Sequence, residues 1–238
     1  MHVSFMDPVR TLIALVLLLP VSLTCNAQGL QYDREIEHMR VLRSTDRTDS
    51  LRTHSARLLK ELPAAPGPLR YEAEWNLAHS LSANGDPLGA TEHAQQALLI
   101  ARAMADTSRI LGSLYQLTKV TVEGRHYQEA DQHRREHLDL ARRYAKDTGQ
   151  LVLALNSMGS MHSRQEDHDS AEYYFREGLR VLGNEQHIAR QALLGNLASL
   201  LGEKGEHAEA ERLLRQAVSE LDSTDVRNKA RALNNLGQ

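Results

Sequence analysis

Five consecutive residues in the middle of the chain have a spacing that could support metal chemistry. His133 and His137 stand one helical turn apart, with Glu136 between them. In zinc peptidases, two histidines at this spacing bind the metal and the glutamate activates a water molecule. This spacing is common by chance, and the surrounding sequence supplies no third ligand. A zinc peptidase is therefore the less favoured alternative, and we expect no catalytic residue, no metal and no cofactor.

The rest of the composition does not favour other chemistry. The 238 residues include 12 histidines, which are scattered without the spacing of a metal site. There is no Gly-x-Ser-x-Gly motif, no phosphate-binding glycine-rich loop after a strand and no acidic calcium loop. A formal net charge of -3 does not indicate the basic surface that binding of nucleic acid needs. We expect a binding protein, not an enzyme, with no nucleic acid as its partner.

A recurring alanine organises the chain. Ala90, Ala130, Ala171 and Ala210 lie 40, 41 and 39 residues apart, each at the same place in a helix-turn-helix pattern. A repeat of this length is one pair of helices that cannot bury its apolar face alone, so neighbouring pairs must stack. The hydrophobic content of 41% with only 4% aromatic residues favours helices that pack through small side chains. The sequence therefore predicts an all-α protein.

Each predicted first helix carries a large residue followed by a small one. The small residue lets two helices approach closely, and its large neighbour fills the adjoining space. Short polar turns join the helices of each pair, with Gly85, Gly124 and Gly205 available for a left-handed backbone. The large-small pairs are Leu77-Ala78, Leu117-Thr118, Met158-Gly159, Leu197-Ala198 and Leu236-Gly237. The positions that we expect to be structural are Ala78, Ala90, Ala130, Gly159, Ala171, Ala198 and Ala210.

These motifs resemble the tetratricopeptide repeat. The resemblance rests on the large-small pairs, on the Gly-x-x-x-x-Ala spacing from Gly85 to Ala90, and on small-large pairs such as Ala97-Leu98 in the second helices. It implies a right-handed superhelical solenoid of antiparallel helix pairs over residues 70–238, with four full units and the start of a fifth. The period of about 40 exceeds the usual 34 of the family, so we expect longer helices. His137 stands where a small residue belongs, so the second unit should pack more loosely.

The first residues have the features of an export signal. Arg10 precedes an apolar stretch over residues 11–23 that is short for a membrane span, and Cys25-Asn26-Ala27 resembles a small-x-small cleavage site. We therefore expect residues 1–27 to be a signal peptide and the mature protein to be periplasmic. Lipidation at Cys25 is the smaller alternative. Residues 28–69 are predicted to form a divergent N-terminal helical hairpin and linker.

The fifth unit stops after its first helix. Residues 230–238 place Leu236 and Gly237 correctly, but no second helix follows, whereas natural arrays end in a polar-faced cap. We therefore expect the chain to be the front part of a longer protein, attached to a membrane only through a later segment. The pattern resembles the exported sensory segments of Bacteroidetes-like signalling proteins, which implies an extracytoplasmic sensing or scaffold role. A stand-alone periplasmic assembly factor is the alternative.

A row of amides provides the candidate site. In tetratricopeptide domains that bind extended peptides, asparagines just before the large-small pair contact the ligand backbone, and a carboxamide can both donate and accept. A protein or peptide partner is therefore expected on the concave side, although the amides could instead only tie adjacent helices together. The row consists of Asn76, Gln116, Ser157, Asn196 and Asn235, and neighbouring positions add Trp75, Tyr115, Asn156, His79, Lys119 and Ser160.

Overall fold

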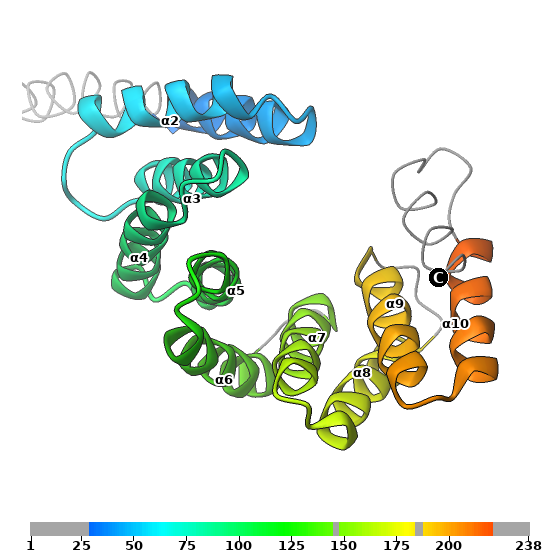
Figure 1. The fold of residues 1–238 in the computed structure, drawn as a ribbon. Helices are drawn as coiled ribbons and strands as arrows, with labels where there is room; N and C mark the ends of the chain where they lie inside the picture. The colour runs from blue at the N-terminus through cyan, green and yellow to red at the C-terminus, as the bar shows by residue number, and fades with distance from the viewer. Residues whose placement is uncertain (1–28, 145–147, 184–187, 221–238) are drawn as a thin grey trace, which may run out of the picture.

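The computed structural model describes residues 29–144, 148–183 and 188–220, and all regular structure within them is helical (Figure 1). The prediction of an all-α protein is thereby confirmed for this part of the chain. The first helix covers residues 29–44. The others are α2 (Thr48–Glu61), α3 (Pro68–Ala83), α4 (Pro87–Ala103), α5 (Thr107–Glu123), α6 (Tyr127–Tyr144), α7 (Thr148–Arg164), α8 (His168–Leu182), α9 (Ile188–Glu203) and α10 (His207–Ser219).

The helices pair in sequence order and the pairs stack into an arc. Residues 29–44 and α2 form an N-terminal hairpin, which is followed by unit 1 (α3 and α4), unit 2 (α5 and α6), unit 3 (α7 and α8) and unit 4 (α9 and α10). The first helices α3, α5, α7 and α9 lie along the inner side of the arc, and the second helices lie along its outer side (Figure 1). The predicted solenoid is therefore observed.

The same type of turn joins the two helices of every described pair. A residue with positive φ follows each first helix, and the next backbone N–H bonds to a carbonyl five residues back, which is a Schellman-type helix end. Gly124 corrects one expectation, because it keeps a right-handed φ of -75° and Arg125 takes the positive φ instead. The left-handed position is fixed five residues before Ala130, and Gly124 is one residue too early. The positive-φ residues that follow the first helices are Asp46, Gly85, Arg125, Glu166 and Gly205, while Ala105 and Gly183 take a positive φ after the second helices α4 and α8.

These turns show that the N-terminal hairpin is in register with the repeats. Asp46 precedes Gly85 by 39 residues, an interval close to the one that separates the later turns. The small positions of the repeat hold Met39 and Leu51 here, and both are fully buried. The hairpin is divergent in side-chain size, which hides its period from the sequence, but it follows the same backbone plan.

Small residues occupy the closest helix contacts. The alanines of the recurring pattern are buried, and so are Ala78 and Ala198. A Cβ placed on Gly159 would lie 2.6 Å from Cδ1 of the buried Phe175, and one on Gly178 would lie 2.9 Å from Cδ2 of Leu193. Such distances are too short for any larger residue, so the glycines let α8 approach α7 and α9.

The second unit departs from this packing. His137 is fully buried and Arg134 is 4% exposed, so polar side chains stand beside Ala130, Leu138 and Ala141 on the face of α6 that packs into the array. Units 2 and 3 also make the least extensive junction among units 1 to 4. The looser packing expected at His137 therefore falls at the junction that follows unit 2.

Two expectations lie outside the described residues. The predicted signal peptide (1–27) and the predicted start of a fifth unit (230–238, including Asn235) both fall there. Among the residues that are described, no helix is long and apolar enough to cross a membrane.

Candidate partner-binding face

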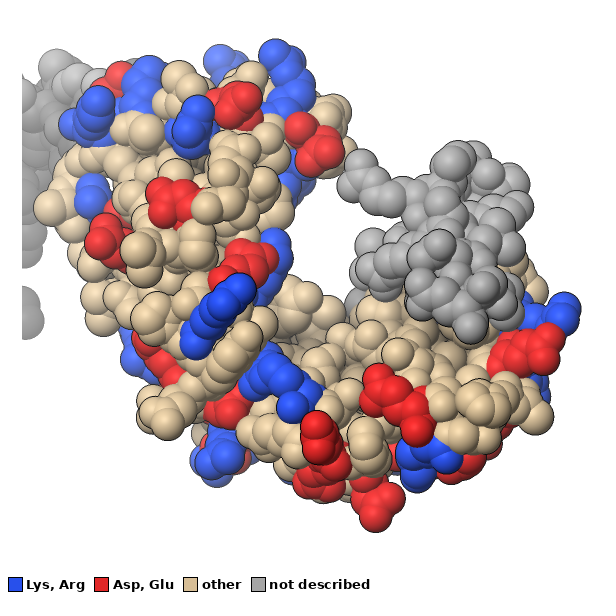
Figure 2. Space-filling view, viewed as in Figure 1, with Lys and Arg blue, Asp and Glu red and all other residues tan. Residues whose placement is uncertain are grey.

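The inner face of the arc is lined by equivalent positions of α3, α5, α7 and α9. Counting from the positive-φ turns, one row holds Trp75, Tyr115, Asn156 and Gly195, and the next row holds His79, Lys119, Ser160 and Ser199. All eight residues keep some solvent exposure. Figure 2 views the arc from its edge, where acidic and basic side chains stand in mixed groups along the arc around the hollow on its inner side.

Two of the predicted amides are committed to contacts between helices. Asn76 is buried, donates to the carbonyl of Glu72 at 2.7 Å and accepts from Arg43 at 2.8 Å. Gln116 is also buried and donates to the carbonyl of Trp75 at 3.2 Å. Each amide thus joins its helix to the first helix of the preceding pair, as the alternative interpretation anticipated. A role toward a partner stays a prediction for both.

The amides farther along the chain are more open. Asn196 donates to Oδ1 of Asn156 at 2.9 Å, which joins α9 to α7, and both side chains are half-buried. This bond uses only one polar atom of each amide, so Nδ2 of Asn156 and Oδ1 of Asn196 can serve a peptide backbone. Ser157, which stands between Gln116 and Asn196 in the predicted row of amides, instead accepts from Nε of Arg134 at 3.2 Å.

Aromatic and basic side chains gather over α3 and α5. The Trp75 indole stacks on His79 with 5.8 Å between ring centroids, and the Arg43 guanidinium lies 4.8 Å from the Trp75 ring centroid. Tyr115 is 37% exposed, and burial of its remaining surface raises the pKa of its hydroxyl. One turn later Lys119 is 47% exposed, 3.7 Å from Glu123. Trp75, Tyr115 and Lys119 thus lie together at one end of the inner face.

Arg43 was not among the predicted site residues. It belongs to the N-terminal hairpin, where the sequence shows no clear repeat. The turn at Asp46 reveals its place in the repeat. Arg43 lies three residues before Asp46, the residue with positive φ, and can therefore be aligned with the later units. The equivalent residues are Ser82, Val122, Ser163 and Gly202, so a cation occurs at this position only in the hairpin.

The residues of the possible zinc motif have other contacts. His137 is enclosed in the core beside the Tyr115 ring, with 6.2 Å between centroids, and burial lowers its pKa to about 4 against a smaller opposing effect of Gln150. Glu136 accepts from Arg102 at 2.5 Å, and His133 lies 3.7 Å from Glu129. Within the described ranges, no group of three or more His, Cys, Asp or Glu residues could hold a metal ion.

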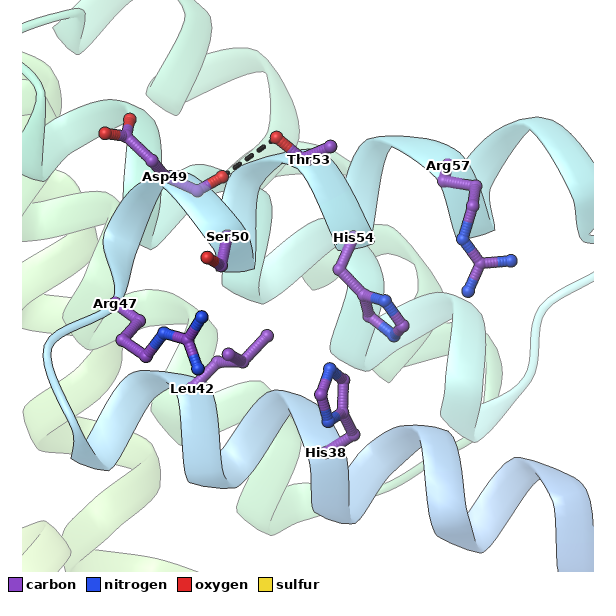
Figure 3. Close-up of a pocket in the computed structure, with 8 residues that line it drawn as sticks. All are labelled: His38, Leu42, Arg47, Asp49, Ser50, Thr53, His54 and Arg57. Atoms are coloured by element: carbon purple, nitrogen blue, oxygen red, sulfur yellow. Dashed lines mark hydrogen bonds between the residues drawn. The ribbon is translucent and has the colours of Figure 1, made fainter.

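A second hollow of about 470 Å³ lies on the N-terminal hairpin (Figure 3). The His38 and His54 rings from its two helices meet edge to face, 4.7 Å apart. Nε2 of His54 lies 2.8 Å from Oε2 of Glu35, and burial lowers the pKa of His54 although Glu35 opposes this. Glu74 and His93 repeat this contact in unit 1 at 2.7 Å. Since the contact recurs between the two helices of successive pairs, we interpret it as a structural contact that joins them.

Comparisons with known proteins identify the repeat. Residues 151–183 and 191–219 match the family model of the tetratricopeptide repeat. These two segments are therefore tetratricopeptide repeats. These two matched tetratricopeptide repeats coincide with units 3 and 4, where the described core is most apolar. No curated protein matches the chain by sequence.

Solved structures share the fold of the tetratricopeptide array. A thermophilic TPR protein of Thermus thermophilus is 19% identical, with 87% of this chain and all of that chain covered and a TM-score of 0.62. A Rap protein complexed with competence and sporulation factor is 15% identical, with 87% and 64% covered and a TM-score of 0.68. A signal-transduction ATPase with a tetratricopeptide repeat sensor from Pyrococcus horikoshii is 18% identical, with 84% and 31% covered and a TM-score of 0.66.

Proposed function

We propose that this chain is a protein- or peptide-interaction module that binds an extended segment of its partner along the inner face of the arc. The observation that carries the proposal is the row formed by Trp75, Tyr115 and Asn156 on successive first helices, with Tyr115 exposed between the other two. The Rap protein complexed with competence and sporulation factor is a supporting case, since a protein that shares this fold forms a complex there.

The two ends of this face suit different parts of a bound segment. Tyr115 and Trp75 can contact an apolar side chain, because large rigid rings concentrate binding energy at interfaces. The open groups of Asn156 and Asn196 can pair with backbone N–H and C=O groups without needing a charge. Neither role needs a catalytic residue, and none is part of the proposal.

The test uses an exposed tyrosine on each side of the arc. A phage-displayed library of random peptides is selected on the purified full chain, and the affinities of the selected peptides are measured for Tyr115→Ala and for Tyr173→Ala. Tyr115→Ala should weaken binding about tenfold or more, as expected for an aromatic anchor. Tyr173 is 57% exposed on α8 of the outer side and provides the matched control. Equal effects of the two substitutions would contradict binding at the inner face.

We further propose that the protein is exported and that the array is the sensing or scaffold part of a longer signalling protein. The support is the signal-like sequence of residues 1–27, together with the tetratricopeptide repeat sensor that forms one part of the Pyrococcus horikoshii ATPase. A stand-alone periplasmic assembly factor would share the export signal but not the output domain.

Two measurements separate these possibilities. A fusion of alkaline phosphatase to the C-terminus should be active, since that enzyme needs an oxidising compartment, and deleting residues 1–27 should abolish the activity. Activity without residues 1–27 would overturn the proposed signal peptide. The gene beyond the Gln238 codon should encode a membrane helix and an output domain. A capping helix followed by a stop codon would instead support the assembly factor.

A further inference from the structure

Arg43 is a partly buried cation whose contacts are neutral. Its guanidinium donates to Oδ1 of Asn76 at 2.8 Å and lies over the Trp75 ring. Burial lowers its pKa, and Glu72 opposes this most strongly. Glu72 itself lies 3.7 Å from Arg109. No carboxylate in the described part of the chain forms an ion pair with Arg43, although burying a charge usually demands one.

A second cation approaches the same place from α5. Lys119 contacts Glu123 only at 3.7 Å, and Glu123 also accepts from Ser82 at 2.6 Å. His79 stacks on the same Trp75 ring, and Lys119 is its equivalent on the neighbouring first helix. Burial is the largest cause of its lowered pKa, followed by Lys119 and Arg43, while Asp46 and Glu123 oppose them. Arg43 and His79 therefore both contact the Trp75 ring, and Lys119 lies near enough to His79 to lower its pKa.

From this arrangement we infer that Arg43, His79 and Lys119 form a pocket for an acidic side chain of the partner. The inference rests on the proposed function and specifies the partner's chemistry. The carboxylate would accept from guanidinium N–H groups that Asn76 leaves unused and from the Lys119 ammonium, which are strong charge-assisted bonds. The pocket exists only at this end of the face, since the positions equivalent to Arg43 in units 1 to 4 are uncharged.

The binding test compares two pools of synthetic, C-terminally amidated peptides that differ only in carrying Glu or Gln at fixed positions. The full chain should retain the Glu pool about tenfold more strongly than the Gln pool, as one charge-assisted bond predicts. Arg43→Gln should remove this preference and Lys119→Gln should reduce it. Arg102→Gln is the matched control, because Arg102 is an exposed arginine on α4 that pairs with Glu136.

The outcomes distinguish the pocket from the proposed function. Equal binding of both pools, with Tyr115→Ala still weakening them, would overturn the pocket and leave the binding face intact. Binding of neither pool would overturn both. A preference that appears only when the peptide C-terminus is a free carboxylate would also overturn the assignment to a side chain.

A second readout needs no selected peptide. The pKa of His79, followed by NMR of its ring protons, should rise in Arg43→Gln and in Lys119→Gln, because each change removes a nearby positive charge. Adding the Glu pool to the unsubstituted chain should raise it as well, since a bound carboxylate favours the imidazolium. An unchanged His79 pKa in both variants would overturn the pocket. If Arg43→Gln does not fold, Lys119→Gln carries the same test.

Discussion

Helices α6 and α8 occupy equivalent places in successive units, but they fill the core with opposite chemistry. Four residues after the recurring alanine, α6 has Arg134 and α8 has Phe175; seven residues after it, α6 has His137 and α8 has Gly178. All four residues are buried. Phe175 and Gly178 of α8 pack tightly against α7 and α9, whereas the equivalent residues of α6, Arg134 and His137, are polar. The turns and small residues thus set the repeat, whereas the side chains between them determine how extensively neighbouring units contact each other.

The largest effect is expected at the tight contact of α7 with α8. Gly159→Leu should destabilise the protein by about 3 kcal/mol or more, because the new side chain must displace the buried Phe175 ring. Chemical denaturation measures the change. Gly195→Leu on α9 is the control, since nothing lies within 4 Å of a Cβ placed there. Equal losses in the two variants would show that close approach at Gly159 is not what matters.

The next effect depends on pH and belongs to α6. Because the folded pKa of His137 is about 4 and its ordinary value is 6.5, its contribution to stability is complete above about pH 6.5 and is lost as the pH falls toward 4. The loss amounts to about 3 kcal/mol at most. Denaturation of the unsubstituted chain and of His137→Gln across this range isolates the effect. Parallel pH profiles would contradict a buried, neutral imidazole.

A smaller effect is expected at the buried arginine. Arg134→Leu gives α6 the residue that α10 has at the equivalent position, Leu214. It should cost no more than about 1 kcal/mol, because Asp131, which pairs with Arg134 at 2.6 Å, is partly exposed and would not be left as a buried, unpaired charge. Asp131 keeps Arg164 at 3.3 Å and Gln165 at 3.2 Å. Equilibrium unfolding provides the measurement. A loss above about 3 kcal/mol would mean that the α6 core requires the charge.

The smallest effect concerns the amide bond between α7 and α9. Asn196→Ala removes the donor to Asn156 and should cost about 1 kcal/mol, the usual net value of one hydrogen bond. Thermal unfolding should show this modest loss, while binding of a selected peptide weakens separately. A change in binding without any change in stability would assign Asn196 to the partner alone, and the reverse result would make it structural.

Most of the backbone plan could be predicted from the sequence, because small residues at a fixed interval are visible without a structure. Ala90, Ala130, Ala171 and Ala210 marked the helix pairs, and all four are buried. The hairpin before α3 was harder to interpret. Its small positions hold Met39 and Leu51, so only the backbone at Asp46 reveals the shared period.

The candidate site could be predicted only in part. The spacing predicted that Trp75, Tyr115 and Lys119 belong to the concave side, and all three keep exposed surface on the first helices α3 and α5. It could not show that Asn76 and Gln116 point into helix contacts, because a side-chain rotation decides whether an amide meets a neighbour or a ligand. Arg43 was missed because the large residues of the hairpin hide its period. Its place on this face follows from the turn at Asp46.

In a stacked array each unit influences only its immediate neighbours, so the sparse junction between α6 and α7 sets how independently the two ends of the arc can move. Tyr115 and Asn156 lie on opposite sides of that junction. A segment bound to both would therefore add contacts across the least extensive junction among units 1 to 4.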